Sequence, residues 1–123
     1  MRLIAVAIIF LNSAFCFTQN AEFFVKEELA KFPKTNAGAI LQFDYLVTNT
    51  GSDTLRITDY KVACPCTKIT FPTVVAPGET AEIHLTFDTK DKYGLQDRSI
   101  YLITNTKRKM ERLRFKVNVV AAE

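Results

Sequence analysis

The sequence contains no tryptophan, and glycine, proline, cysteine and histidine are all scarce in it. Among 123 residues there are 4 glycines, 4 prolines, 3 cysteines and 1 histidine. So few glycines leave little room for a loop that cradles a phosphate group. The single histidine, His84, lacks the further ligands that a four-coordinate zinc site needs. It also has no serine or cysteine near it in sequence, so no nucleophilic triad is indicated and no enzyme is predicted.

A large excess of one charge sign over the other is missing as well. The chain has 16 Lys and Arg residues against 13 Asp and Glu residues, which gives a formal net charge of +3. Nucleic-acid-binding domains usually have a much larger basic excess, so no nucleic-acid partner is predicted. The most concentrated charge is a basic cluster near the C-terminus, which consists of Lys107, Arg108, Lys109, Arg112, Arg114 and Lys116.

This basic cluster has two interpretations. It could dock to an anionic surface, for example the phosphate groups of lipopolysaccharide. The favoured interpretation is a solvated hairpin, because charged side chains at an exposed edge keep a strand from pairing with another sheet. Lys107, Arg108 and Lys109 are nevertheless candidate binding residues, as is Tyr93, an aromatic residue in the polar loop 88–97.

Long apolar runs are confined to the first residues. Arg2 precedes an apolar run over residues 3–11, and small residues follow, which is the pattern of a secretory signal peptide. The run is too short for a membrane span, which needs about 20 apolar residues. We therefore predict a signal peptide over residues 1–19 and one domain over residues 20–123, with no transmembrane segment in the mature chain. The product is therefore expected to be exported.

Cys16 lies near the end of this signal and has two interpretations. Lipidation at the mature N-terminus requires a small residue just before the cysteine, but Phe15 stands there. The favoured interpretation is a cysteine that is removed with the signal. Only Cys64 and Cys66 then remain, so the sequence predicts no disulfide framework. Exported proteins do not usually keep reactive thiols by accident, which makes this pair a candidate site.

Apolar and polar residues alternate along most of the remaining chain. Apolar residues take every second position over residues 41–47, 81–87 and 113–119. This period of two is typical of strands with one buried face. His84 falls on the polar face of its strand and is expected to be an exposed surface histidine. The buried positions shift by one residue near Asp59, which indicates a β-bulge.

Turn signals separate the expected strands. Gly51 lies in a turn where glycine can adopt positive φ at no steric cost, and Pro77 with Gly78 forms a second turn. Residues 104–110 are expected to form a hairpin between the last two strands. No long helix fits anywhere, so the predicted fold class is an all-β, antiparallel immunoglobulin-like β-sandwich of about seven strands.

The segment that follows the predicted signal is less regular. Phe23 and Val25 fit a short first strand, and Pro33 interrupts the chain after it. A single helical turn over residues 27–31 is a candidate for the residues in between. Neither internal repeats nor low-complexity tracts occur, so a single domain is expected.

Four motifs occur in order along the chain: FDYLVTNTGSDTLRI, ACPCT, APGETAEIHLTFDT and GLQDRSIYLITN. Together they resemble an uncharacterised family of immunoglobulin-like domains in secreted bacterial proteins. This domain of unknown function typically has an Asn-Thr-Gly turn, a Cys-Gly-Cys-Thr motif and a Pro-Gly-Glu turn, and it is similar to the major-sperm-protein and Hydin-type sandwiches. The resemblance covers residues 36–120 and implies a sandwich of seven strands, export across the inner membrane and no known enzyme activity. It therefore implies a location in the periplasm, at the cell surface or outside the cell of a Gram-negative bacterium.

One departure from this resemblance concerns Pro65. The family usually has glycine between the two cysteines, whereas proline fixes φ at about −65° and removes the main-chain donor. Proline also pushes the preceding residue, Cys64, towards an extended conformation. A role that needs a flexible glycine between the cysteines is therefore not expected here.

Three interpretations of Cys64 and Cys66 remain open. In an extended strand their Cα atoms would lie about 6.6 Å apart, close to the upper limit of about 6.8 Å for a disulfide. Such a disulfide would be easily reduced and could serve thiol redox chemistry. Two thiolates on one face would also suit Cu(I). The favoured interpretation is two small, partly buried side chains that pack like hydrophobic residues.

The pattern as a whole favours an exported immunoglobulin-like module with a structural or protein-binding role in the bacterial envelope, where its partner is an unknown envelope protein. No cofactor is expected under this interpretation. The alternative is a periplasmic thiol-redox or copper-handling protein that uses Cys64 and Cys66. An antibody-type domain would need an inter-sheet disulfide between widely spaced cysteines packed on a tryptophan, which this sequence lacks.

Overall fold

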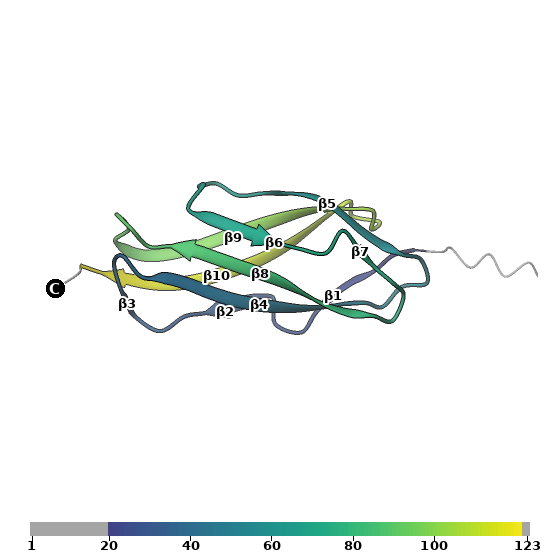
Figure 1. The fold of residues 1–123 in the computed structure, drawn as a ribbon, viewed down its shortest axis with the longest axis horizontal. Helices are drawn as coiled ribbons and strands as arrows, with labels where there is room; N and C mark the ends of the chain where they lie inside the picture. Colours follow the sequence, from purple (N-terminus) through teal and green to yellow (C-terminus); the bar gives the residue numbers. More distant parts are fainter. Residues whose placement is uncertain (1–19, 122–123) are drawn as a thin grey trace, which may run out of the picture.

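The computed structural model describes residues 20–121, which form two β-sheets packed face to face (Figure 1). These residues contain no helix, and hence none that could cross a membrane. The predicted all-β sandwich is therefore confirmed. The predicted signal peptide, residues 1–19, lies outside the described residues, and Cys16 lies there too.

The first sheet has four strands. Across the sheet they follow the order β1–β4–β8–β6, with bounds β1 (Phe23–Val25), β4 (Ile40–Asn49), β8 (Thr80–Asp88) and β6 (Thr67–Thr70). All neighbouring strands in this sheet run antiparallel. The ladder between β4 and β8 forms its centre and extends from Ile40 opposite Asp88 to Thr48 opposite Thr80.

The second sheet has six strands. Their bounds are β2 (Leu29–Lys31), β3 (Thr35–Asn36), β5 (Leu55–Lys61), β7 (Val74–Val75), β9 (Gly94–Thr104) and β10 (Met110–Val120). The order across the sheet is β2–β10–β9–β5–β7, and β3 also pairs with β10. β2 and β3 run parallel to β10. The pairs β10–β9, β9–β5 and β5–β7 are antiparallel. The hairpin of β9 and β10 forms the longest strand pair of this sheet.

The N-terminal segment crosses from one sheet to the other. The predicted strand at residues 23–25 is confirmed as β1, but the helical turn proposed for residues 27–31 is wrong, because Leu29–Lys31 forms β2 beside β10. The amide of Phe32 continues this pairing by donating to the carbonyl of Lys116 at 2.9 Å. A single helical turn would fix several dihedral angles for one hydrogen bond, so pairing with the edge of β10 is favoured.

Apolar side chains from both sheets fill the space between the layers. The predicted alternation is confirmed, since Ile83, Leu85 and Phe87 of β8 are all fully buried. Phe87 meets Phe115 of the opposite sheet, with ring centroids 4.8 Å apart. Burying one such side chain contributes about 1.5–3 kcal/mol. The core therefore depends on strands that the period of two identifies.

Tyr45 links the two sheets through a polar contact inside this core. Its hydroxyl donates to the carbonyl oxygen of Arg114 at 2.6 Å. Tyr45 belongs to β4 of the first sheet and Arg114 to β10 of the second, so the hydrogen bond spans both layers. Burial raises the pKa of Tyr45, because the phenolate is poorly solvated in an apolar interior.

Local predictions about turns and bulges have mixed outcomes. The bulge near Asp59 is confirmed, because the register between β5 and β9 shifts between Ile57 and Asp59. The turn at Gly78 is confirmed as well, with φ of 79°. The reason given for Gly51 is wrong, since Gly51 is not among the glycines with positive φ. Glycine is needed there because a Cβ atom would lie 2.0 Å from the carbonyl oxygen of Asn20.

Candidate functional site

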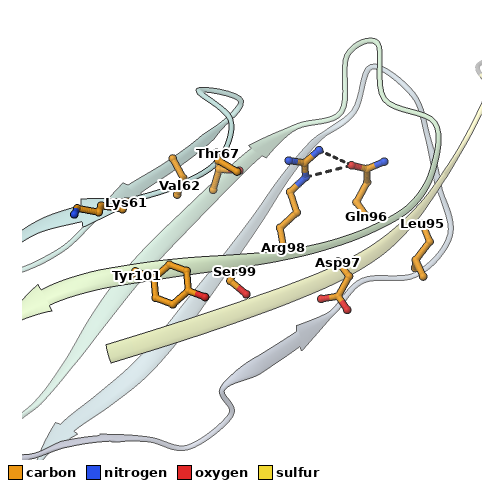
Figure 2. A pocket seen from close by; sticks show the side chains of 10 residues that line it. Lys61, Val62, Thr67, Leu95, Gln96, Asp97, Arg98, Ser99 and Tyr101 are labelled. Atoms are coloured by element: carbon orange, nitrogen blue, oxygen red, sulfur yellow. Dashed lines mark hydrogen bonds between the residues drawn. The ribbon is translucent and has the colours of Figure 1, made fainter. Parts of the chain in front are cut away.

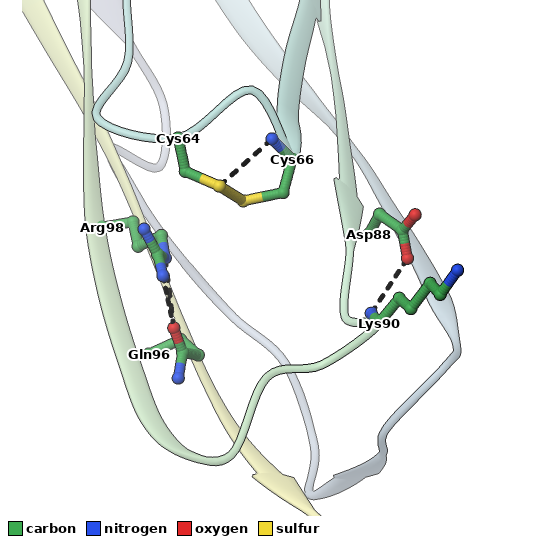
Figure 3. Close-up of a disulfide and its surroundings, with 6 residues drawn as sticks. All are labelled: Cys64, Cys66, Asp88, Lys90, Gln96 and Arg98. Atoms are coloured by element: carbon green, nitrogen blue, oxygen red, sulfur yellow. Dashed lines mark hydrogen bonds between the residues drawn. A yellow bond between two sulfur atoms is a disulfide. The ribbon is translucent and has the colours of Figure 1, made fainter.

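Cys64 and Cys66 form a disulfide in the turn that follows β5 (Figure 3). Their Cα atoms lie 5.2 Å apart, closer than an extended strand would place them. The chain turns at Pro65, and the amide of Thr67 donates to the carbonyl of Cys64 at 3.1 Å. Both side chains are half-buried, as expected. The favoured interpretation of two unbonded cysteines is therefore wrong, whereas the disulfide that the thiol-redox interpretation requires is present, because this turn brings the sulfur atoms together.

Copper binding by Cys64 and Cys66 stays a prediction. It requires the reduced pair, because the thiolates that would ligate Cu(I) are joined in the disulfide. Within residues 20–121, no three His, Cys, Asp or Glu side chains gather as a possible metal-ligand group.

The loop that contains the disulfide is attached to the first sheet by a main-chain hydrogen bond. The amide of Asp88 donates to the carbonyl of Cys66 at 2.9 Å and thereby joins the loop to the end of β8. Figure 3 shows Arg98 and Gln96 of β9 on the side of the disulfide opposite to Asp88. Arg98 donates from Nε and Nη2 to Oε1 of Gln96 at 3.2 and 2.7 Å. Its guanidinium also lies 5.5 Å from the ring centroid of Phe87, a favourable cation–π contact that covers the core.

Between this loop and β9 lies a cavity of about 340 Å³, which we call the β9 notch (Figure 2). β5 pairs with β9 only from Thr104 to Tyr101. The chain then leaves the second sheet and enters the first as β6, whereas β9 itself reaches back to Gly94. The notch occupies the place that β5 would fill if it continued. Its walls include Lys61, Val62 and Ala63 on one side and Leu95, Asp97 and Ser99 on the other.

The outward-facing side chains of β9 and β10 form a second feature, here called the β9–β10 face. Cross-strand neighbours on it are Tyr101 and Arg112, Ser99 and Arg114, Asp97 and Lys116, and Leu95 and Asn118. Three aromatic or aliphatic side chains are exposed along β9 or just before it: Tyr101 (39%), Leu95 (68%) and Tyr93 (79%). Met110 of β10 is exposed beside them. The face thus mixes apolar and basic side chains.

Asp97 is the acidic residue at the middle of this face. Nη2 of Arg114 donates to both of its carboxylate oxygens at 3.0 and 2.9 Å. Nζ of Lys116 lies 3.7 Å from Oδ2 of Asp97. The hydrogen bonds from Arg114 and the nearby positive charges hold the pKa of Asp97 below its ordinary value. Asp97 therefore stays ionised at neutral pH and orders the basic side chains around it.

The four predicted binding-loop residues do not come together in one site. Tyr93 precedes the first residue of β9, whereas Lys107–Lys109 follow its last residue in the predicted hairpin. They lie at opposite ends of an extended strand. Arg108 instead joins Met110 and Phe24 in the lining of another cavity, of about 490 Å³. Binding of a partner or an anionic surface by these residues stays a prediction.

His84 occupies the outer face of the first sheet, as predicted. Its Nδ1 lies 2.5 Å from Oδ1 of Asp44, its cross-strand neighbour on β4. Alternation places His84 outward but does not reveal this partner, because the sequence of one strand does not specify its register with a distant strand.

The β9 notch was not predicted from the sequence for the same reason. Pro65 was the one available signal, since proline lacks the donor that a continuing strand needs.

Comparison with known proteins gives a family and several structural relatives. The family model described as "Protein of unknown function (DUF1573)" matches residues 23–119. Among solved structures, a protein of unknown function from Porphyromonas gingivalis W83 has a TM-score of 0.73 at 15% identity, covering 85% of this chain and 50% of that chain. This chain thus spans half the length of that relative. No curated protein matches the chain.

Two further relatives connect the fold to PapD-like and major-sperm-protein sandwiches. The ASH/PapD-like domain 7 of human CEP192 has a TM-score of 0.66 at 11% identity, covering 85% of this chain and 89% of that chain. WR4, a Caenorhabditis elegans member of the MSP family, has a TM-score of 0.53 at 9% identity, covering 80% of this chain and 97% of that chain. Identities this low show the fold alone.

These findings agree with the predicted resemblance in family and in fold, whereas its individual motifs stay predictions. The matching family model begins at β1 and ends at the penultimate residue of β10, so it includes both sheets. The chain therefore belongs to the family described as "Protein of unknown function (DUF1573)".

Proposed function

We propose that this chain is an exported module of the envelope of a Gram-negative bacterium, with a structural or protein-binding role and no catalytic activity. Its partner is another envelope protein, which binds the β9–β10 face. The observation that carries this proposal is the set of exposed apolar residues on that face, Leu95, Tyr101 and Met110, beside the basic side chains of β10.

The composition of this face supports protein binding rather than simple solvation. Tyrosine, methionine and arginine are enriched at the centres of protein interfaces. Tyr101 lies directly opposite Arg112, and Met110 follows on the same face opposite Ile103. The contact of Nη2 of Arg114 with both carboxylate oxygens of Asp97 holds charged groups in place before a partner arrives. Less ordering is then required when a partner binds.

Site-specific crosslinking in intact cells tests this proposal. A photoreactive residue is placed at position 101 in one variant and at position 46 in another, because Tyr101 and Leu46 are almost equally exposed, at 39% and 41%. Leu46 lies on the outer side of the first sheet. We expect an adduct with one envelope protein from position 101 and none from position 46. Equal adducts from both positions, or none from either, would contradict the proposal.

Export is tested separately by cell fractionation and by sequencing the N-terminus of the product. We expect the chain in the envelope or medium, with a mature N-terminus near residue 20, because residues 1–19 have the pattern of a signal peptide. Accumulation of the full-length chain in the cytoplasm would contradict the proposed location.

A second candidate function is thiol–disulfide exchange, which the half-exposed Cys64–Cys66 disulfide favours. A thiolate of a dithiol partner protein would attack one sulfur and form a mixed disulfide, releasing the other cysteine as a thiolate. The second thiol of the partner would then displace the cysteine. The partner leaves oxidised by two electrons, and Cys64 and Cys66 remain as thiols.

Equilibration with glutathione buffers, followed by thiol trapping and mass spectrometry, tests this candidate. A reduction potential well above about −300 mV supports it, and a lower potential, typical of structural disulfides, ends it. The reduced protein is then offered Cu(I). Retention of one ion per chain by the wild type, but not by a variant with Cys64→Ser and Cys66→Ser, would support copper handling, and no retention would remove it.

A further inference from the structure

The second sheet has an open edge inside the molecule. β10 pairs with β9 along its whole length, from Gly94 to Ile103. On the other side, β5 pairs only with residues 101–104 of β9. Within residues 20–121 no strand pairs with this side of β9 between Leu95 and Ile100. About half of a central strand is therefore unpaired on one side.

The register shows which main-chain groups face this open side. The amide of Thr104 donates to the carbonyl of Lys109, which places Thr104 in a hydrogen-bonded pair with the β10 side. In an antiparallel ladder such pairs alternate with pairs whose main-chain groups point away. The amides and carbonyls of Leu95, Asp97 and Ser99 therefore point into the β9 notch.

The notch is an open cavity of about 340 Å³ beside β9, and several of the usual protections of a sheet edge are missing there. Natural sheet edges are usually protected by charged side chains, by proline, by bulges or by a covering loop. The charge of Asp97 is here paired with Arg114 and Lys116. Residues 95–99 contain no proline, and the register with β10 is continuous there. The disulfide loop makes no main-chain hydrogen bond with residues 95–99, and its Cys66 is instead joined to Asp88 of the first sheet. From Leu95 to Ser99 the open edge spans about 13 Å, the length of a five-residue strand segment.

The side chains around the notch indicate what such a segment must have. Leu95 and Tyr101 lie at its two ends, and both are exposed, so apolar side chains of an added segment could pack on them. Asp97 already binds Arg114 and Lys116. Lys61 at the end of β5 has no ion pair within residues 20–121. The unpaired charge at the notch is therefore positive, and it favours a carboxylate on the segment.

We propose that the β9 notch binds one extended segment of a partner protein, which adds to the second sheet as a strand beside Leu95–Ser99. The segment alternates apolar and polar residues and has a carboxylate placed to meet Lys61. Main-chain hydrogen bonds provide the affinity, and the side-chain contacts provide the specificity. This inference rests on the proposed protein-binding function, to which it adds the site and the conformation of the bound partner.

A synthetic peptide tests the inference in solution. The probe has eight residues, alternates valine with threonine, has one central glutamate and is capped at both ends. It is titrated into the ¹⁵N-labelled mature chain and followed by NMR. We expect the largest amide shifts at Leu95, Asp97 and Ser99. The same peptide with alternate main-chain amides methylated should bind at least tenfold more weakly, because it lacks the donors that strand addition needs.

Matched substitutions test the same edge from the side of the protein. Ser99→Pro removes a donor that faces the notch without removing one that faces β10, and we expect at least fivefold weaker binding of the probe. Ser99→Ala keeps the donor and should bind within twofold of the wild type. If Ser99→Pro fails to fold, Lys61→Glu replaces it. That variant should lose affinity for the glutamate probe and regain it for a probe with lysine at the same position.

Several results would overturn the inference. One is the absence of amide shifts at a millimolar concentration of the probe peptide, and another is a set of shifts centred on the hairpin at 107–109. A third is binding of the methylated peptide as tight as that of the unmodified probe. Self-association of the chain through the notch would overturn it as well. Crosslinking from position 101 in cells that carry Ser99→Pro or Lys61→Glu separates the two proposals. An adduct that survives both substitutions ends strand addition and leaves protein binding intact, whereas no adduct in the wild type ends the proposed function.

Discussion

One buried amide, that of Asn49, holds together the turn that follows β4. Its Oδ1 accepts from the amides of Glu22 and Gly51 at 3.1 and 3.0 Å. Its Nδ2 donates to the carbonyls of Asp53 and Val75 at 2.7 and 3.0 Å. These contacts use the full hydrogen-bonding capacity of an asparagine side chain. Three separate segments are thereby held within reach of one residue.

Gly51 allows this close approach, and its substitution should be costly. A Cβ atom there would lie 2.0 Å from the carbonyl oxygen of Asn20 and 2.7 Å from the amide nitrogen of Glu22. We expect Gly51→Ala to lower the free energy of unfolding by about 1–3 kcal/mol, the usual cost of overpacking. Urea denaturation measures this, with Ser52→Ala as a control that should stay within about 0.5 kcal/mol. Equal stability of the two variants would contradict the packing described for Gly51.

Tyr45 gives a prediction about alkaline pH. Because burial raises its pKa, the folded chain keeps the phenol proton to higher pH than the unfolded chain, whose tyrosine titrates at about 10. The stability from the neutral phenol is therefore complete below pH of about 10 and is lost as the pH rises above that value. At neutral pH, Tyr45→Phe should cost about 0.5–1.5 kcal/mol through the lost hydrogen bond to Arg114.

Urea denaturation from pH 8 to pH 11 measures both effects of Tyr45. Above pH of about 10, the wild type should lose stability more steeply than Tyr45→Phe, by at most about 1.4 kcal/mol per pH unit. Parallel curves for the two proteins would show that Tyr45 titrates alike in the folded and unfolded states.

At the scale of strands and loops, the sequence predicts local features well and pairing poorly. The strands at 81–87 and 113–119 were predictable, because alternation is recorded within each strand. β2 was not, because it has three residues and gains its stability from the edge of β10. The Cys64–Cys66 disulfide was one of three open interpretations but not the favoured one, and the β9 notch was not predicted, because both depend on the turn at Pro65 after the end of β5.

Amide exchange along β9 gives a prediction at this scale. In the free mature chain, the amides of Leu95, Asp97 and Ser99 should exchange much faster than those of Gln96 and Arg98. The first three face the notch, whereas the other two face β10, so protection should alternate along the strand. NMR-detected hydrogen exchange measures this. Uniform protection over residues 95–99 would show that the edge is already paired in solution.

The disulfide loop gives another prediction. A disulfide stabilises a protein more when it closes a longer loop, and a loop of about 15 residues gives about 3 kcal/mol. Cys64 and Cys66 are separated by only 2 positions. We expect the variant with Cys64→Ser and Cys66→Ser to lose less than about 2 kcal/mol and to keep its fold. Urea denaturation of this variant and of the reduced wild type should agree, and unfolding of either would make the disulfide a structural requirement.

At the scale of the whole molecule, two packed sheets present two different outer faces. The first sheet turns outward the pair of His84 with Asp44. The second turns outward the β9–β10 face, and beside it lies the β9 notch. A sandwich of this kind can host many functions, so the fold does not choose among them. The proposed protein-binding function depends on the second sheet, where exposed apolar groups, ordered charges and unpaired main-chain groups occur together.

The decisive measurement is the affinity of the purified mature chain for the envelope protein that crosslinks at position 101. Tyr101→Ala should raise the Kd at least tenfold, because truncating an aromatic hot-spot residue at the centre of an interface costs about 2 kcal/mol or more, and a tenfold change in Kd corresponds to about 1.4 kcal/mol. Leu46→Ala, on the opposite sheet, should leave the Kd unchanged. Equal Kd values for the wild type and Tyr101→Ala, or equal losses for both variants, would show that the β9–β10 face is not the binding surface.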